Sequence, residues 1–409
     1  MNVVIIGNSS AAIGCIEGIR QADKNANITV ISNEKYHTYS RPLISYLLWG
    51  RTDEQRMKYR PDDFYEKMGC KLLLEKTATK IDRAKKQVLL SDGTSLAYDK
   101  LLVATGSDPI VPPIEGLDKV AKKHTFMSLA DAKGLEADLT AETNVLVMGA
   151  GLIGLKCVEG IAEKVKSITV VDMADRILPS ILNKESAGIV QAHIEKQGVS
   201  FILDDAVAAF KGNKAVLKSG KELAFDVLVI AVGVRPGIAL AREAGIDCDR
   251  GVRTDSRCQT SDPDIYAAGD CTSSLDITCG EMRVLALLPN AYMQGECAGL
   301  NMAGAGKLYD KAIPMNSIGF FDLHMVTAGS YCGDEIVIES KEGYKKLFVQ
   351  NKRLVGYIIV GDVKRAGIYT SLIREKTDIS TIDFEMIKTA PGLMAFSKSD
   401  RQIKMGSVQ

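Results

Sequence analysis

The sequence lacks an excess of charge of either sign, a long apolar run and a secretion signal. Its 51 basic side chains balance its 51 acidic ones, whereas nucleic-acid or anionic-membrane partners call for a basic excess. No apolar run approaches the roughly 18 residues of a membrane span, and the first residues do not follow a signal-peptide pattern. We therefore expect a cytoplasmic protein with no membrane and no nucleic-acid partner.

Cysteine and histidine are present but scattered. The nine cysteines include no CxxC and no CxxxxC spacing, and the four histidines are dispersed. Metal sites need such clusters, so no metal is predicted. Free cysteines are mostly buried, and structural disulfides are rare in a reducing compartment. We expect most of these cysteines to be reduced core residues.

The chain has the composition of an ordinary globular protein and an internal repeat of two βαβ units. It has 409 residues, of which 46% are hydrophobic and 25% charged, which suggests two or three domains. Hydrophobic periodicity predicts strands over residues 3–6, 28–31, 145–148 and 168–171, and helices over 13–22, from the second loop to about 166, and over 290–302.

The loop in "VMGAGLIGLK", residues 147–156, has the spacing of a dinucleotide-binding turn. In such a loop the first glycine makes the turn, the second admits a pyrophosphate and the third lets helix and strand pack closely. The phosphates then lie on the helix N-terminus, where free N–H groups favour negative charge. The predicted cofactor-binding residues are Gly149, Gly151, Leu152, Ile153 and Gly154.

The chain opens with a less perfect version of this loop in "VVIIGNSSAA", residues 3–12. Gly7 fits the first position, and Ala12 is accepted at the third. Ser9 replaces the second glycine, so the phosphate contact either loosens or receives a hydrogen bond from the hydroxyl. We predict a second nucleotide site here, with Ser10 beside Ser9 at the helix start.

Acidic residues close the second strand of each unit, where ribose hydroxyls are expected. Asp172 does so in the second unit and favours NADH, because a 2'-phosphate would clash with its carboxylate. Arg176 lies nearby in the sequence and keeps NADPH possible, as the less favoured cofactor. Glu34 stands at the matching place in the first unit, either as a ribose ligand or as a solvated turn carboxylate.

Six short motifs in a fixed order resemble the FAD- and NAD-dependent pyridine nucleotide–disulfide oxidoreductase superfamily. Within it, the chain looks like the NADH:rubredoxin oxidoreductase and ferredoxin-reductase-like branch. The resemblance is close over about residues 1–305 and looser beyond. Besides the two glycine loops, the motifs are "YSRPLIS" at 39–45, "ATGSDP" at 104–109, "AVGVRP" at 231–236 and "IYAAGD" at 265–270.

The resemblance implies an α/β fold with two Rossmann-like nucleotide-binding domains and a small α+β C-terminal domain. An NAD domain is inserted into an FAD domain, and the last domain caps the flavin. The predicted segments are 1–110 for the first part of the FAD domain, 111–240 for the NAD domain, 241–314 for the second FAD part and 315–409 for the C-terminal domain.

The resemblance also implies roles for matching positions around FAD. Gly7, Ser9 and Ala12 would line the pyrophosphate, Glu34 the adenosine ribose and Ala78 the adenine. Asp270, beside Gly269, would bind the ribityl or pyrophosphate region, and the helix start at Asn290 would face the flavin N1–C2 carbonyl. Thr105 and Gly106 belong to the crossover between domains, and Gly233 completes the predicted cofactor-binding set.

Arg41 and Pro42 occupy the place where many members of the superfamily carry a redox cysteine. The resemblance implies that they abut the isoalloxazine, with Arg41 as a catalytic candidate; a surface turn is the alternative. Cys15 lies in the first helix, but position 20, where a second redox cysteine would stand, is Arg20. Thiol catalysis is therefore not expected.

Lys156 replaces the glutamate that the family usually carries after the second loop. If it lies near the nicotinamide and flavin, its positive charge favours anionic reduced flavin, which makes it a catalytic candidate. The alternative is that Lys156 turns to solvent and Glu159, one turn on, fills the space.

The predicted function is that of a flavoprotein oxidoreductase with FAD and NADH. It passes hydride between NAD(H) and FAD and single electrons between FAD and a small iron–sulfur or rubredoxin-type carrier, in either direction. The alternatives are an NADH oxidase or other small-acceptor reductase, and a flavin-based redox sensor or interaction protein. A homodimer is possible.

Overall fold

The computed structural model describes residues 1–341 and 343–404. The chain divides into two compact units. The first holds Met1–Asp175, Gln197–Leu275 and Glu281–Ala312, and the second holds Arg176–Lys196, Asp276–Gly280 and the chain from Ile313. The predicted division at residues 110, 240 and 314 stays a prediction, and its residues 342 and 405–409 lie outside the described part.

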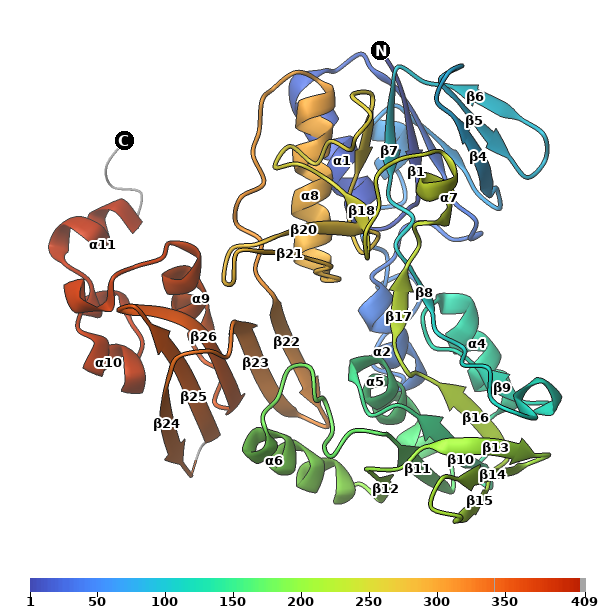
Figure 1. The fold of residues 1–409 in the computed structure, drawn as a ribbon, viewed down its shortest axis with the longest axis vertical. Helices are drawn as coiled ribbons and strands as arrows, with labels where there is room; N and C mark the ends of the chain where they lie inside the picture. Colours follow the sequence, from blue (N-terminus) through green and yellow to red (C-terminus); the bar gives the residue numbers. More distant parts are fainter. Residues whose placement is uncertain (342, 405–409) are drawn as a thin grey trace. The chain divides into compact units, whose positions relative to one another are not determined.

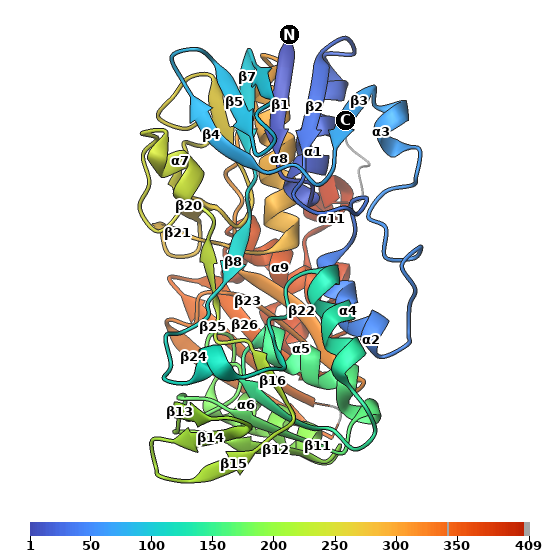
Figure 2. The same ribbon diagram turned by 90° about the vertical axis from the view of Figure 1, so that its right-hand side faces the viewer.

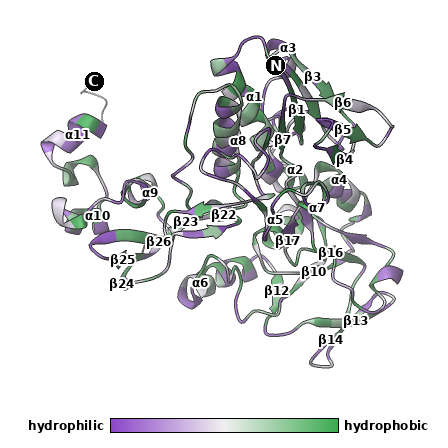
Figure 3. Cartoon of the chain, turned by 45° about the horizontal axis from the view of Figure 1, so that its top comes forward, coloured by the Kyte–Doolittle hydropathy of each residue, from purple (hydrophilic) through white to green (hydrophobic). Residues whose placement is uncertain are grey.

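A five-stranded parallel sheet forms the core of the amino-terminal half. Its strands run in the order β19 (Ile265–Ala267), β7 (Lys100–Val103), β1 (Asn2–Ile6), β2 (Asn27–Ile31) and β3 (Cys70–Leu73). Strands buried on both faces read as continuous apolar runs, and β1 and β7 are coloured hydrophobic in Figure 3. Because alternate residues face opposite sides, Val3 and Ile5 pack into one cluster and Val4 and Ile6 into another.

Helices cover one face of this sheet and a small antiparallel sheet covers the other (Figure 1). The helices are α1 (Ser10–Ala22), α3 (Phe64–Lys67) and α8 (Leu288–Met302). The opposite face carries β4 (Ala78–Asp82), β5 (Gln87–Leu90), β6 (Ser95–Ala97) and α7 (Ala239–Glu243). Helix α8 begins two residues before the predicted Asn290, because Pro289 suits the first turn of a helix.

A second five-stranded parallel sheet repeats the plan. Its order is β12 (Val199–Ile202), β11 (Ser167–Val171), β10 (Asn144–Met148), β16 (Val227–Ile230) and β9 (Lys123–His124). The accompanying elements are α4 (Leu129–Asp138), α5 (Leu152–Ile161), β13 (Val207–Lys211), β14 (Lys214–Leu217) and β15 (Glu222–Ala224). Helix α5 ends earlier than the predicted residue 166, because a 3-10 turn (Ala162–Lys164) and extended Val165 lead directly into β11.

Two short antiparallel strands connect the regions of the two parallel sheets. Strand β8 (Ser107–Pro109) pairs with β17 (Val234–Pro236). Three further strands, β18 (Val252–Arg253), β20 (Thr272–Asp276) and β21 (Glu281–Arg283), form a sheet of their own.

The second unit is built on a five-stranded antiparallel sheet with the order β22-β23-β26-β25-β24. Its elements are β22 (Met315–Phe320), β23 (Leu323–Gly329), β24 (Asp334–Ser340), β25 (Gly343–Gln350), β26 (Arg353–Gly361), α6 (Lys184–Glu195), α9 (Ala366–Arg374), α10 (Phe384–Thr389) and α11 (Lys398–Lys404). Within the described residues, three α-helices follow β26. With both parallel sheets and this small domain, the predicted α/β fold class is confirmed.

Four glycines bring α1 and α8 into backbone contact in the first unit (Figure 1 and Figure 2). A Cβ added at Gly295 would lie 1.9 Å from the Ala11 carbonyl oxygen, and one at Gly299 would lie 2.2 Å from that of Cys15. Gly14 and Gly18 approach α8 as closely. Any side chain at these positions would push the helices apart.

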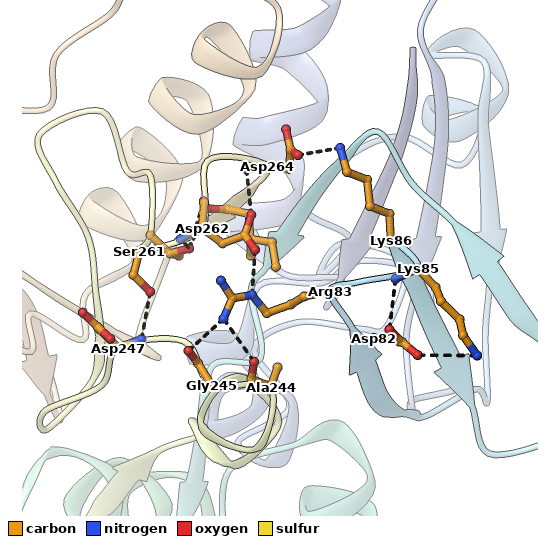
Figure 4. Close-up of polar contacts among 12 residues, drawn as sticks. Asp82, Arg83, Lys85, Lys86, Ala244, Gly245, Asp247, Ser261, Asp262 and Asp264 are labelled. Atoms are coloured by element: carbon orange, nitrogen blue, oxygen red, sulfur yellow. Dashed lines mark hydrogen bonds and ion pairs between the residues drawn. The ribbon is translucent and has the colours of Figure 1, made fainter.

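Ion pairs join the β4–β5 hairpin to the segment that returns after the second sheet (Figure 4). Arg83 Nε donates to Asp262 at 2.7 Å, and Arg83 Nη1 donates to the Gly245 carbonyl at 3.0 Å. Lys86 Nζ lies 2.6 Å from Asp264 Oδ2, and Lys100 Nζ lies 2.7 Å from Asp264 Oδ1. These contacts hold together two chain segments that are far apart in sequence.

We expect Gly299→Ala to lower the free energy of unfolding by about 1–3 kcal/mol, the usual cost of overpacking. Gly188→Ala in α6 is the matched control, because a Cβ there would meet nothing within 4 Å. The control should be neutral or stabilising by up to about 1 kcal/mol. Urea unfolding of both variants measures the difference, and equal stabilities would contradict the close-contact argument.

A pH-dependent contribution is expected from Asp264, because hydrogen bonds from Lys100 and Lys86 lower the pKa of its carboxyl. Such a group stabilises the folded state above its unfolded pKa of about 3.9, and the contribution is lost as pH falls through the folded value. Asp264→Asn should lower stability at pH 7 by about 1 kcal/mol or less, as partly exposed pairs do. The gap to wild type should shrink in melts below about pH 4; a gap that widens there would contradict the assignment.

Candidate functional site

The second glycine loop has the geometry that its spacing predicts. Gly149 has φ +108°, and a Cβ there would lie 2.2 Å from the Ala231 carbonyl oxygen. A Cβ at Gly154 would lie 2.1 Å from the Gly149 carbonyl oxygen, which explains the tight packing of helix on strand. A Cβ at Gly151 would meet nothing within 4 Å. Open space therefore lies where the pyrophosphate is expected, and half-buried Leu152 and Ile153 begin α5.

The first glycine loop repeats this turn. Gly7 has φ +116°, and a Cβ there would lie 2.1 Å from the Ala104 carbonyl oxygen. Ser9 is the N-cap of α1, but its hydroxyl makes no capping hydrogen bond to the helix. Ser10 and Ala12 are buried in the first turn. The serine in place of the second glycine thus makes no side-chain hydrogen bond to the N–H groups of the helix start.

Three of the four helices of ten or more residues in the first unit begin without a side-chain cap and without an acidic residue in the first turn. These are α1, α5 and α8. Helix α4, by contrast, has a full capping box between Ser128 and Asp131. Uncapped N–H groups and the helix dipole favour anionic ligands. Two of these helices follow the glycine loops, and the third is the helix predicted to face the flavin, with Asn290 buried in its first turn.

Asp172, directly after β11, is bonded to the second glycine loop. Its Oδ2 accepts a hydrogen bond from the Ala150 N–H at 2.6 Å, and its Oδ1 accepts one from the Ala174 N–H at 2.8 Å. A carboxylate has about four acceptor positions, so two remain for ribose hydroxyls. Arg176, within the second unit, donates to the carbonyls of Leu182 and Pro179.

Glu34 has two protein partners that sequence reasoning did not anticipate. The Tyr39 hydroxyl donates to Glu34 Oε2 at 2.7 Å, and Arg41 forms an ion pair with Oε1. Arg41 also donates to the Met127 carbonyl at 3.1 Å, and the Leu129 N–H donates to the Tyr39 hydroxyl at 2.9 Å. Glu34 is therefore an anchored carboxylate rather than a solvated one, and it keeps further acceptor positions for a ribose.

Arg41 and Pro42 lie in a 3-10 turn, η1 (Arg41–Leu43), that runs directly into α2 (Ile44–Leu48). Pro42 is exposed, as the surface-turn alternative expects, but Arg41 is held by its carboxylate and carbonyl partners. Burial raises the pKa of the Asp270 carboxyl, while the Ser107 hydroxyl and Arg41 lower it. Electrostatics therefore links the Arg41 turn to the predicted flavin residue Asp270.

The remaining predicted residues are Thr105, Gly106, Gly233, Gly269 and Ala78. The Thr105 hydroxyl donates to the Gly237 carbonyl at 2.6 Å, and Gly106 and Gly233 both have positive φ. The Gly269 N–H donates to Gln294 of α8 at 2.7 Å. Ala78 begins β4 and packs on the adjoining core. Gln294 was not singled out in the sequence, because a lone glutamine within a helix gives no signal there.

Lys156 does not turn to solvent, so that part of the alternative is wrong. Its side chain is 12% exposed and forms an ion pair with Glu159, which is 3% exposed. The ammonium also lies 4.4 Å from the centroid of the Tyr46 ring. Helical spacing of three residues allows the pair, but only tertiary packing brings Tyr46 to it.

The cysteines offer no activated thiol beside the Arg41 turn. All nine, each within the described residues, are free, and five are buried. Burial raises the pKa of the Cys15 and Cys157 thiols well above the usual range, the opposite of what a reactive thiolate needs. Among residues 1–341 and 343–404, no group of three or more potential ligands is placed to hold a metal ion, and no helix is long and apolar enough to cross a membrane.

These features fit two nucleotide cofactors. The open positions at Gly151 and at the starts of α1 and α5 suit pyrophosphates, and the Asp172 and Glu34 carboxylates suit ribose hydroxyls. FAD would be held by the first loop, Glu34, Asp270 and α8, and NAD(H) by the second loop and Asp172.

Comparisons with known proteins agree with this geometry. Residues 1–295 match the family model of the pyridine nucleotide-disulphide oxidoreductases, and residues 314–377 match the rubredoxin NAD+ reductase C-terminal domain. The subunit epsilon of an NADH-dependent phenylglyoxylate dehydrogenase from Aromatoleum evansii is 29% identical, over 93% of each chain. An assimilatory nitrate reductase electron transfer subunit from Bacillus subtilis is 30% identical over 94% of this chain, which spans about half (51%) of that relative's length.

A solved structure of an NAD-dependent persulfide reductase from A. fulgidus is similar in fold, with a TM-score of 0.87 and 27% identity. The likeness covers 99% of this chain and 84% of that one. With a family model matched over most of its length, the chain belongs to the pyridine nucleotide-disulphide oxidoreductase family and is an FAD-dependent NAD(P)H oxidoreductase.

Proposed function

We propose that this protein moves electrons between NADH and a small iron–sulfur or rubredoxin-type protein, through FAD. The observation that carries the proposal is the pair of helix starts without side-chain caps, α1 and α5, in one unit whose Arg41–Leu43 turn carries no cysteine. When bound, FAD supplies the exchange between two-electron hydride and single electrons. Without a thiol relay, the electrons must leave to an acceptor directly.

The chain's own residues divide the work of binding and orientation. The N–H groups at the start of α5 would hold the dinucleotide pyrophosphate, and Asp172 would accept hydrogen bonds from its ribose hydroxyls. The start of α1, Glu34 and Asp270 would hold the flavin nucleotide, and Arg41 would add a positive charge anchored by Glu34. The start of α8 supplies a positive dipole end, which favours the negative charge of a reduced flavin.

The partner is a protein carrier in this proposal. Its support is the match of residues 314–377 to the C-terminal domain of rubredoxin NAD+ reductases. Two relatives add to it by name, one as a subunit of an NADH-dependent dehydrogenase and one as the electron transfer subunit of a nitrate reductase. A reducing cytoplasmic location, which suits nine free cysteines, and a homodimer belong to the same proposal.

NADH is the proposed nucleotide, because a 2'-phosphate would meet the Asp172 carboxylate. We expect Asp172→Asn to weaken NADH binding by about tenfold, the worth of a charge-assisted hydrogen bond, while NADPH binding stays or improves. Stopped-flow reduction of the flavin gives both dissociation constants, with exposed Asp175→Asn as a charge-matched control. An unchanged NADH-to-NADPH ratio would remove Asp172 from the nucleotide site.

The carrier is tested with the purified protein and NADH under anaerobic conditions. Oxidised rubredoxin and a two-cluster ferredoxin are added separately, and the visible absorbance of each is followed. Fast bleaching of either one supports the proposal and identifies the carrier class. If the flavin is reduced by NADH but neither protein responds, and fast turnover appears only in air, the carrier proposal fails in favour of an oxidase.

A further inference from the structure

The helix of the second glycine loop, α5, is fastened to α2 by contacts along one helical face. Lys156 places its ammonium over the Tyr46 ring, 4.4 Å from the centroid. Four residues further on, a Cβ at Gly160 would lie 2.7 Å from the Ser45 carbonyl oxygen. Residues four apart lie on the same side of a helix, so the two contacts form one row.

A third contact extends this row into the 3-10 turn η3 (Ala162–Lys164). Trp49 Nε1 donates a hydrogen bond to Glu163 Oε1 at 3.2 Å. Trp49 is the single tryptophan of the chain. The α2–α5 seam consists of Ser45, Tyr46 and Trp49 on one side and Lys156, Gly160 and Glu163 on the other.

The positive charge of Lys156 interacts with groups that lie directly beside it. Glu159, almost wholly buried, forms an ion pair with the ammonium, and the Tyr46 face covers it. A cation held by a carboxylate and an aromatic face is locally compensated. Its charge is thus a weak source of field for a more distant group, whereas its contacts fix the helix position.

The seam also reaches the Arg41 turn without an intervening loop. Helix α2 begins at Ile44, directly after Arg41–Leu43, so the turn and α2 form one helical segment. Helix α5 begins directly after Gly151, its N-cap. A short rigid path therefore runs from the second glycine loop through α5 and α2 to Arg41.

We propose that Lys156 and Tyr46 are positioning residues, which hold the NAD-binding loop in register with the Arg41–Pro42 turn. This inference rests on the proposed function, because register matters when hydride passes between nucleotides held on the two sides. A misplacement of about 1 Å can slow such a step about a hundredfold. Lys156 thus acts through α2, not through its charge on the flavin.

The experiment compares Lys156→Met, Tyr46→Leu and the double variant in the FAD-loaded protein. Each single variant should slow the limiting rate of flavin reduction by NADH by about tenfold or more, with little change in the NADH dissociation constant. The double variant should be no slower than the slower single one, because coupled residues are not additive. The flavin midpoint potential should stay as in wild type.

Two controls separate positioning from general damage. Tyr46→Phe should keep the wild-type rate, since phenylalanine also offers an aromatic face to the cation. Lys164→Met removes another ion-paired lysine just after α5, 2.6 Å from Glu136, and should leave the rate unchanged. Trp49 emission, measured on the FAD-loaded protein, should shift in Lys156→Met and Tyr46→Leu but not in either control.

Three results would overturn the inference. A potential that shifts in Lys156→Met but not in Tyr46→Leu would place the lysine charge at the flavin. If the rate reductions of the two single variants multiply in the double variant, the two residues act independently of each other. Unchanged rates would remove any role in the reaction. Failure of the proposed function looks different, because wild type itself would then pass no electrons from NADH, whatever the variants' Trp49 emission.

Discussion

The backbone contact between α1 and α8 is the constraint on which the first nucleotide site depends. Helix α1 follows the first glycine loop, and α8 returns from far along the chain to lie against it. Because Gly14, Gly18, Gly295 and Gly299 lack side chains, the two helices approach at backbone distance. The starts of both helices, each without a side-chain cap, are thereby held over the same sheet.

The proposed second nucleotide site also depends on glycines that allow close backbone contact. Gly149 and Gly154 set the turn and the packing of α5, and Gly151 leaves space beside its N-terminus. Asp172 then holds the loop through the Ala150 N–H. The two proposed sites share a physical principle: neither helix start is capped by a protein side chain, and free N–H groups at a helix start suit an anionic ligand.

Each of the two cations beside the predicted sites forms an ion pair with a nearby carboxylate. Arg41 is paired with Glu34, and Lys156 with Glu159, so neither cation stands alone at low dielectric. The pairs differ in what they reach. Arg41 bonds onward to the Met127 carbonyl and lowers the pKa of Asp270, whereas Lys156 is covered by Tyr46. The Arg41–Glu34 pair therefore affects the electrostatic potential at the predicted flavin residue Asp270. The proposed role of the Lys156–Glu159 pair is to hold α5 against α2.

Local sequence determined the elements whose physics is local. Glycine spacing at 149–154, the apolar runs before the loops and the closing acid Asp172 predicted turns, parallel strands and nucleotide contacts, because each depends on neighbours in the chain. Tertiary structure alone decided the partners of Glu34 and the burial of Lys156 over Tyr46, since these contacts join segments separated by long stretches. It also decided that α1 packs against α8, because these two helices lie near opposite ends of the first unit's sequence.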